Sequence, residues 1–197
     1  MLGVSGAANA LPIQWTMASG GNGHWYDVVT FNGTWDDANS DVQSLSYNGA
    51  NGYLATLTSV AENDFVWSNF PYHGYFLGGF QTNKDLEPGG NWAWVTGEAW
   101  NYTNWTTAGV GIVDEPNNSA GDEDRLQFDW WFGEGTWNDL HNNSASFPHN
   151  IDLNPPGGTG GYLVEYEAAP VPEPATMLLF GIGIVGLAGS KLRRRKA

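Results

Sequence analysis

One stretch of the chain concentrates oxygen-bearing side chains of the kind that bind hard cations. Its carboxylates, with asparagines interleaved among them, are Asp114, Glu115, Asp122, Glu123, Asp124, Asp129, Glu134 and Asp139. Ca²⁺ is held in proteins by about six to eight oxygens of carboxylates, amides and carbonyls. A generic acidic surface accounts for scattered carboxylates, but it does not account for this clustering. The sequence therefore predicts a calcium site in this stretch.

The distribution of charge excludes one class of partner. The chain of 197 residues has a formal net charge of −14, and five of its seven basic residues lie within residues 191–196. Residues 1–170 carry only Lys84 and Arg125 against 20 carboxylates. Such a surface repels a phosphate backbone, so we expect no nucleic-acid partner. Because the chain has no cysteine, packing of its 11 Trp, 9 Phe and 8 Tyr must stabilise one domain of about 150 residues.

Two helices are expected early in the chain. Thr34 is a candidate N-cap for a helix over 35–46, whose inward face would carry Trp35, Ala38, Val42 and Leu45. Ser59 and Glu62 form a capping box that opens a second helix ending near Asn69. The inward face of this second helix would carry Ala61, Phe65 and Val66.

Short strands account for most of the remaining domain. Aromatic or β-branched runs separated by Gly, Asn or Pro predict strands over 24–31, 53–57, 75–80, 91–95, 125–132, 136–140 and 161–167. Helices followed by antiparallel strands describe an α+β domain. The polar excursion over residues 101–124 is longer than a compact domain usually tolerates without an organiser. Calcium is the organiser that its composition favours.

Both ends of the chain resemble processing segments. Ala8, Asn9 and Ala10 have the small-x-small form of a signal peptidase site, so residues 1–10 are interpreted as a partial signal peptide. A chance match within an irregular N-terminus is the alternative. At the other end, Val171-Pro172-Glu173-Pro174 precedes an apolar run and a basic cluster, which predicts a transmembrane helix over about 175–192 with its basic end in the cytoplasm.

The order of these C-terminal features resembles a PEP-CTERM sorting tail, here residues 171–197. In that family the tail is recognised by an exosortase in Gram-negative envelopes, so the resemblance implies exosortase as a partner. An ordinary single-pass membrane anchor is the alternative. Both interpretations place the domain outside the cytoplasm, and the PEP-CTERM resemblance implies an exported protein of the cell envelope or extracellular matrix of a Gram-negative bacterium.

A series of short motifs follows one another along residues 22–167: Trp35-Asp36-Asp37-Ala38, residues 52–59, Phe76-Leu77-Gly78-Gly79, residues 92–97, Asn104-Trp105, Glu115-Pro116-Asn117 and Trp137-Asn138-Asp139. In this order they resemble the motifs of a C-type lectin-like domain. The last two tripeptides together, in this order and separation, are highly specific. The resemblance implies an α+β C-type lectin-like fold with two helices, antiparallel sheets and a long calcium-binding loop.

The chain also departs from this family. Val42 and Val164 stand where the family usually has one cystine, and Arg125 and His141 lie near the other. Residues 142–160 form an insertion rich in Pro, Gly and Asn that could cover or extend the site. A second calcium position known in some members is doubtful here, because Asn118 and Lys84 supply little negative charge.

The resemblance implies one Ca²⁺ bound by five residues that also contact sugar hydroxyls: Glu115, Asn117, Glu123, Asn138 and Asp139. Asp122 or Asp124 remains an alternative to Glu123. A cis peptide before Pro116 would turn the two flanking side chains toward one ion. In the family, the order Glu-Pro-Asn accompanies mannose-type sugars. Trp137 is interpreted as a core residue rather than a sugar-stacking one.

The sequence thus predicts an exported, calcium-dependent lectin that binds glycans or exopolysaccharide. A surface or matrix adhesin with a purely structural calcium is the alternative. No enzyme is expected, because the sequence shows no Ser-His-Asp or Cys-His arrangement and no phosphate-binding loop.

Overall fold

The computed structural model describes residues 11–71, 74–107, 114–119, 121–128, 135–142 and 160–168. The segments predicted as signal peptide and sorting tail, with the predicted span 175–192, lie outside these residues, as does most of the insertion over 142–160. In the described part of the chain, no helix combines the length and apolar character needed to cross a membrane.

The described elements are two α-helices, three short 3₁₀ helices and nine strands. In chain order they are β1 (Ile13–Gln14), η1 (Met17–Ser19), β2 (Trp25–Thr30), α1 (Trp35–Asp41), η2 (Val42–Ser44), β3 (Ser46–Tyr47), β4 (Ala50–Leu54), α2 (Val60–Asn69), β5 (Tyr75–Gln81), η3 (Lys84–Leu86), β6 (Trp92–Trp94), β7 (Arg125–Phe128), β8 (Trp137–Leu140) and β9 (Gly161–Tyr166).

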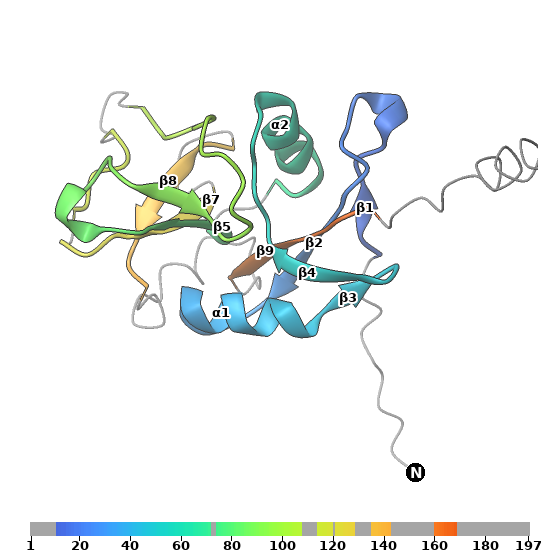
Figure 1. Cartoon of the computed structure of the whole chain (residues 1–197), viewed down its shortest axis with the longest axis horizontal. Helices are drawn as coiled ribbons and strands as arrows, with labels where there is room; N and C mark the ends of the chain where they lie inside the picture. Colours follow the sequence, from blue (N-terminus) through green and yellow to red (C-terminus); the bar gives the residue numbers. More distant parts are fainter. Residues whose placement is uncertain are drawn as a thin grey trace, which may run out of the picture.

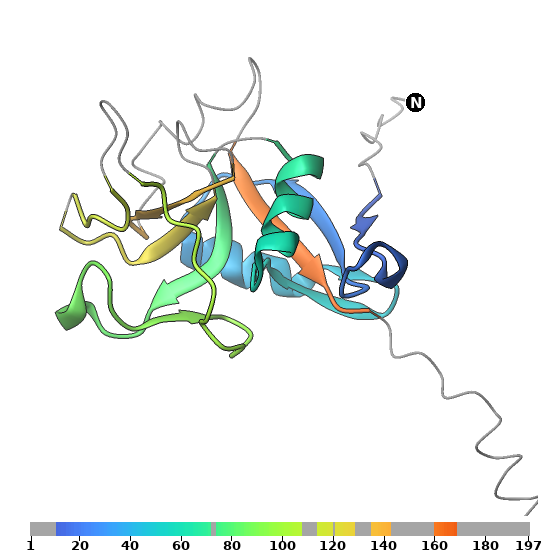
Figure 2. The same cartoon turned by 90° about the horizontal axis from the view of Figure 1, so that it is seen from above.

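The strands form one sheet that runs the length of the domain (Figures 1 and 2). Its main order is β1-β2-β9-β5-β7-β8, while β4 pairs with β9 and β6 pairs with β5. The expectation of antiparallel sheets was wrong at one junction, where β5 and β9 run parallel through Phe76 and Tyr162. Parallel neighbours need a long connection, and the segments between these two strands form β6, β7, β8 and their loops.

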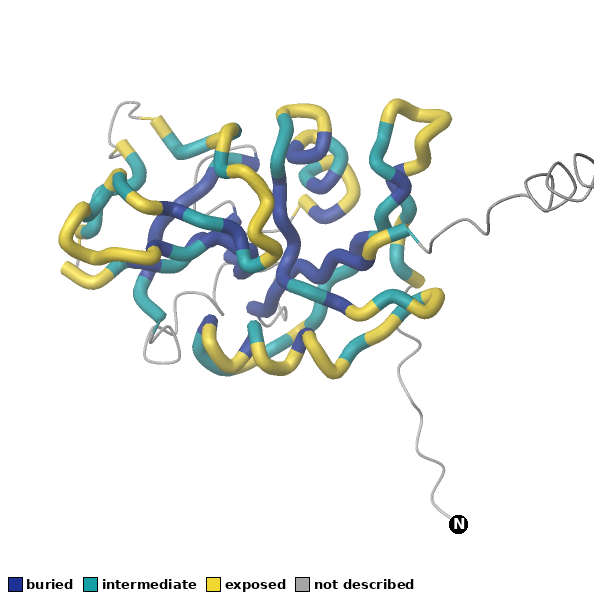
Figure 3. Tube along the Cα trace, in the orientation of Figure 1, coloured by how far each residue is buried: buried dark blue, intermediate teal, exposed yellow. Residues whose placement is uncertain are grey.

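The sheet separates two apolar cores, one on each face. Side chains of β9 alternate, so that Tyr162 and Val164 pack with α1 whereas Leu163 packs with α2. All three side chains are fully buried, and burial of each contributes about 2 kcal/mol. The central strands are accordingly buried while the outer surface of α1 is exposed (Figure 3).

Helix α1 begins as the sequence predicts and ends earlier. The Thr34 side chain accepts a bond from the Asp37 N–H, and the Asp37 carboxylate accepts one from the Thr34 N–H, at 3.1 and 3.0 Å. The α-helix ends at Asp41 and continues as the 3₁₀ helix η2. Val42 is buried in the same core as Val164, so apolar packing occupies the position of the missing cystine.

The inward face of α2 was predicted correctly at Val66, which is buried, and at Phe65, which packs against the core. It was wrong at Ala61, which is exposed, whereas Glu62 and Asn63 are buried. Glu62 accepts bonds from the N–H and hydroxyl of Thr58, at 2.7 and 2.9 Å, instead of completing the capping box at Ser59. The buried side of this helix therefore combines apolar residues with two polar ones whose partners lie in the protein.

Candidate calcium and ligand site

The β7–β8 pair places the second tripeptide at one end of the sheet. Strand β8 pairs antiparallel with β7, with Asp139 opposite Leu126 and Asn138 opposite Gln127. Trp137 is fully buried and its indole N–H donates to Asn63 Oδ1 at 2.9 Å. Edge-to-face contacts with Trp94, Tyr102 and Trp105 surround its ring. Trp137 is therefore a core residue, as predicted.

The loop carrying the first tripeptide folds back onto Asp139. Glu115 N donates to Thr106 O at 2.8 Å, and the Glu115–Pro116 peptide is cis, as predicted. Asp139 accepts the backbone N–H groups of Asn117 and Asn118 through its two oxygens, at 3.0 and 2.9 Å. Asn117 Nδ2 donates to Glu115 Oε2 at 2.5 Å. Glu115, Asn117 and Asp139 thus lie together although 22 residues separate Asn117 from Asp139.

Glu123 reaches the same place through a tight turn. Its backbone N–H donates to Asn118 Oδ1 at 3.0 Å, and its carboxylate accepts the Ser119 N–H at 2.5 Å. Asn118 and Gly121 both have positive φ, at 48° and 86°, a conformation that asparagine and glycine adopt most readily. The turn brings the carboxylate of Glu123 close enough to affect the titration of Glu115.

Negative charge accumulates at this site. Burial raises the pKa of Glu115 to about 8, with further increases from the hydrogen bond and charge of Asp139 and from the charge of Glu123. Burial and the charge of Asp139 also raise the pKa of Glu123, while bonds from Ser119 lower it. A divalent cation among these oxygens would compensate charge that the protein itself leaves uncompensated.

The donor set fits calcium in its chemistry. Asn117 Oδ1 is buried and has no hydrogen-bond partner in the described part of the chain, because the amide nitrogen faces Glu115. Asn138 lies beside Asp139 on β8, but its amide donates to Gln127 Oε1 at 3.2 Å. Within the described ranges, no group of three or more His, Cys, Asp or Glu side chains is placed so that it could hold a metal ion. Hydrogen bonds nevertheless bring Glu115, Asn117 and Asp139 together, and Glu123 lies near enough for its charge to raise the pKa of Glu115.

Comparisons with known proteins address the two parts of the chain separately. Residues 170–195 match the PEP-CTERM protein-sorting motif. Lectin BRA-3 of Megabalanus rosa is 31% identical over 97 residues, and halomucin of Haloquadratum walsbyi is 35% identical over 98 residues. These matches cover 49% and 46% of this chain, but 52% of the barnacle lectin and only 1% of halomucin.

Solved structures show the fold. C-type lectin CEL-I of Cucumaria echinata matches with a TM-score of 0.53 and 20% identity, over 76% of this chain and 93% of CEL-I. The carbohydrate-recognition domain of cow CD23 matches with a TM-score of 0.53 and 21% identity, over 74% of this chain and 89% of that one. The described domain has a C-type lectin-like fold. A calcium-independent type II antifreeze protein also matches, with a TM-score of 0.51 and 18% identity, over 83% of this chain and 98% of that one.

The sequence did not predict that Lys84 and Arg125 form a cluster of ion pairs at the edge of this lectin-like domain. Lys84 Nζ contacts Asp122 and lies 2.9 Å from Asp124 Oδ2, and Arg125 Nη1 lies 2.9 Å from the same oxygen. Arg125 also pairs with Asp36 at 3.1 Å and stacks over Trp35. Both alternatives to Glu123, Asp122 and Asp124, are thus engaged with basic side chains. The signal available in the sequence was that these are the only two basic residues before residue 170.

Proposed function

We propose that this lectin-like domain binds carbohydrate through a calcium ion held by Glu115, Asn117, Glu123, Asn138 and Asp139. The observation that carries the proposal is the buried Asn117 Oδ1, which has no partner among the described residues and lies beside carboxylates that raise one another's pKa. A bound calcium would supply open coordination positions for two neighbouring sugar hydroxyls.

The side chains have distinct roles in recognising such hydroxyls. Each hydroxyl can donate its proton to a carboxylate and accept one from an amide. Glu115 supplies an acceptor and Asn117 a donor on the two sides of Pro116. Their present mutual bond of 2.5 Å is the contact that a sugar hydroxyl would replace. This order of acceptor and donor favours mannose-type sugars, as the resemblance implies.

The relatives support carbohydrate as the ligand class. Lectin BRA-3 is named as a lectin, and the CD23 structure was obtained in the presence of a GlcNAc2Man3 oligosaccharide. These are binding proteins rather than enzymes, in agreement with the expectation for this chain. The antifreeze relative is calcium-independent, so the fold alone does not imply calcium. The calcium assignment rests on the five residues of this chain.

Thermal unfolding tests the calcium part of the proposal. A ligand that binds only the native state stabilises it by about 2.7 kcal/mol at a concentration 100 times its Kd. We expect millimolar calcium to raise the Tm of the full-length chain and excess chelator to reverse the rise, with magnesium as the matched control. Identical melting curves with calcium and chelator would contradict the proposal.

Sugar preference tests the recognition part. The double substitution Glu115→Gln with Asn117→Asp keeps the charge count and the oxygen ligands while exchanging acid and amide. We expect it to retain calcium but weaken mannose relative to galactose by about tenfold, since an unpaired polar group costs about 1–3 kcal/mol. Calorimetry on both proteins measures this ratio. An unchanged preference with intact calcium binding would show that Glu115 and Asn117 do not select the sugar.

The PEP-CTERM motif implies export and sorting by an exosortase to the cell surface. We propose the envelope or extracellular matrix of a Gram-negative bacterium as the final location, with glycans or exopolysaccharide as the partner. In a host with exosortase, the mature protein should lack residues 191–197. Mass spectrometry of envelope-associated protein tests this, and a tail with its intact basic cluster would contradict it.

A further inference from the structure

The two basic side chains of the lectin-like domain converge on one buried carboxylate. Lys84 and Arg125 are the only basic residues before residue 170, and each contacts Asp124 Oδ2 at 2.9 Å. The Asp124 side chain is only 2% exposed, whereas that of Lys84 is 57% exposed. Residues 1–170 contain 20 carboxylates, yet both basic side chains of this range contact Asp124, the residue that follows Glu123.

Lys84 holds both sequence neighbours of Glu123. Its ammonium contacts Asp122 and Asp124, so these two side chains lie on the same side of the backbone. In an extended segment, the residue between two such neighbours points to the opposite side. The Glu123 carboxylate does not contact Lys84 in the ion pairs of this cluster; it accepts the Ser119 N–H, and its charge raises the pKa of Glu115.

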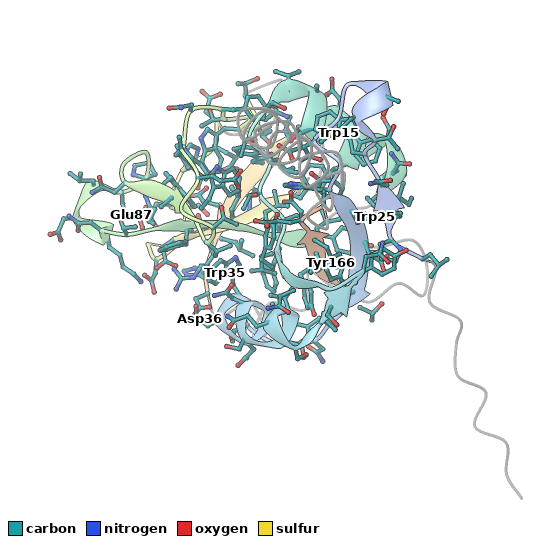
Figure 4. All side chains as sticks on the ribbon, turned by 45° about the vertical axis from the view of Figure 1, so that its right-hand side comes forward. Trp15, Trp25, Trp35, Asp36, Glu87 and Tyr166 are labelled. Carbon is teal, nitrogen blue, oxygen red and sulfur yellow. The ribbon has the colours of Figure 1, made fainter. Side chains whose placement is uncertain are left out.

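The contacts of Lys84 and Arg125 with Asp124 join separate elements of the domain. Lys84 begins the 3₁₀ helix η3 in the loop between β5 and β6, and the backbone of Gln81 at the end of β5 donates to Asp124 O at 3.0 Å. Figure 4 shows Glu87 of this loop at the outer edge of the molecule, away from Trp25 and Tyr166. Arg125 attaches the same aspartate to β7 and, through Asp36, to the start of α1.

We infer that Lys84 is a positioning residue for the calcium ligand Glu123, acting through Asp122 and Asp124. An exposed ion pair contributes only about 0–1 kcal/mol, but Lys84 also bridges Asp122 to the buried Asp124, which would keep Arg125 as a cationic partner without it while Asp122 would lose its contact to this pair. Asp124 Oδ1 already lacks a hydrogen-bond partner within the described residues. Without Lys84, repulsion would separate Asp122, Glu123 and Asp124, and Glu123 would leave its orientation. This inference rests on the calcium site proposed above.

The calcium Kd of a Lys84 variant distinguishes a positioning role from a purely electrostatic one, because the two roles change the Kd in opposite directions. Replacing Lys84 with Gln removes a positive charge near the site, so attraction through space alone would tighten calcium binding. Positioning predicts the opposite: calorimetry on the full-length chain should show a calcium Kd about tenfold higher in Lys84→Gln. Lys84→Arg should restore a Kd within about twofold of wild type. Asp85→Asn, at the exposed neighbour, calibrates the through-space effect.

Hydrogen exchange without calcium gives a second readout that does not depend on metal binding. In Lys84→Gln, the Ser119 N–H that donates to Glu123 should exchange at least tenfold faster than in wild type, while amides of β9 should be unchanged. An unchanged or lower Kd, or unchanged exchange at Ser119, would overturn the inference. If wild type binds no calcium, the proposed function fails, and the exchange experiment still decides whether Lys84 orients Glu123.

Discussion

Two buried acidic clusters of the domain are satisfied in opposite ways. In the first, Glu165 of β9 and Glu62 of α2 lie on either side of the Tyr26 hydroxyl, which is 3.2 and 2.6 Å from their carboxylates. Each carboxylate oxygen has at least one donor of its own, while the single proton of the Tyr26 hydroxyl is shared between the two carboxylates and that of the Thr56 hydroxyl between Glu165 and Glu98. Glu165 contacts His24, Tyr26 and both donors of Thr56, while Glu62 contacts Asn22, Tyr26 and both donors of Thr58.

In the second cluster, around Glu115 and Asp139, the protein does not supply a hydrogen-bond donor for every buried acceptor oxygen. Asp139 is satisfied by backbone N–H groups, but Asn117 Oδ1 and Asp124 Oδ1 are buried without partners among the described residues. In the first cluster the protein supplies a donor for every carboxylate oxygen, whereas the second cluster keeps buried acceptor oxygens without a donor. Asn117 Oδ1 is the one of these that the proposed calcium ion would engage.

The largest expected effect comes from changing an acid to an amide in the first cluster. Glu165→Gln replaces one acceptor oxygen with an NH₂ group that meets existing donors. We expect the free energy of unfolding in chelator to fall by about 3 kcal/mol, because the partners of a buried carboxylate lose their acceptor. Denaturant titration measures the loss. Glu167→Gln, two residues along and exposed, is the control and should change stability by less than about 0.5 kcal/mol.

The same chemical change in the second cluster should affect binding instead of folding. Because its pKa is raised to about 8, Glu115 is mostly protonated at pH 7 without calcium, so the neutral Glu115→Gln should leave stability in chelator unchanged within about 1 kcal/mol. The calcium Kd should rise about 100-fold, because a carboxylate ligand is lost. Calorimetry and denaturant titration on one preparation provide both values, with Asp114→Asn as the control. A loss of stability as large as that for Glu165→Gln would remove the distinction between the clusters.

The smallest expected effect is a pH dependence from the first cluster. The hydrogen bond that the His24 ring donates to the Glu165 carboxylate raises the pKa of His24, against the lowering effect of burial. A raised histidine pKa contributes stability that is fully present below the unfolded value of about 6.5 and is lost as pH rises through the folded pKa. Stability in chelator should therefore fall by up to about 1 kcal/mol from pH 6 upward. His24→Gln should flatten this part of the pH profile in denaturant titrations.

Local patterns were sufficient for part of the fold and the site. The start of α1 at Thr34, the extent of α2 and the pairing of β7 with β8 follow from capping residues and alternation that lie within a few residues of each other. The two tripeptides indicated which residues approach each other. Strands β1 and β3 were missed because two residues are too few to show alternation.

Contacts between distant residues were not predictable in this way. Nothing near Glu62 in the sequence shows that its carboxylate meets Tyr26, which lies 36 residues earlier and adds a buried polar contact to the inward face of α2. Counting the charges identified Lys84 as unusual, but its partner Asp124 follows 40 residues later, at the end of the polar excursion. Similarly, the amide of Asn138 contacts Gln127 because the register of β7 and β8 places these residues opposite each other.

The path of β9 determines where the chain leaves the described domain. The last residue of β9, Tyr166, pairs with Trp25 beside β1, at the end of the sheet opposite β8 (Figures 1 and 4). The segment that matches the sorting motif follows from this end. The last described residue, Ala168, is therefore separated from the candidate site by the width of the sheet, so a change at the domain's exit point need not disturb the residues around Asp139.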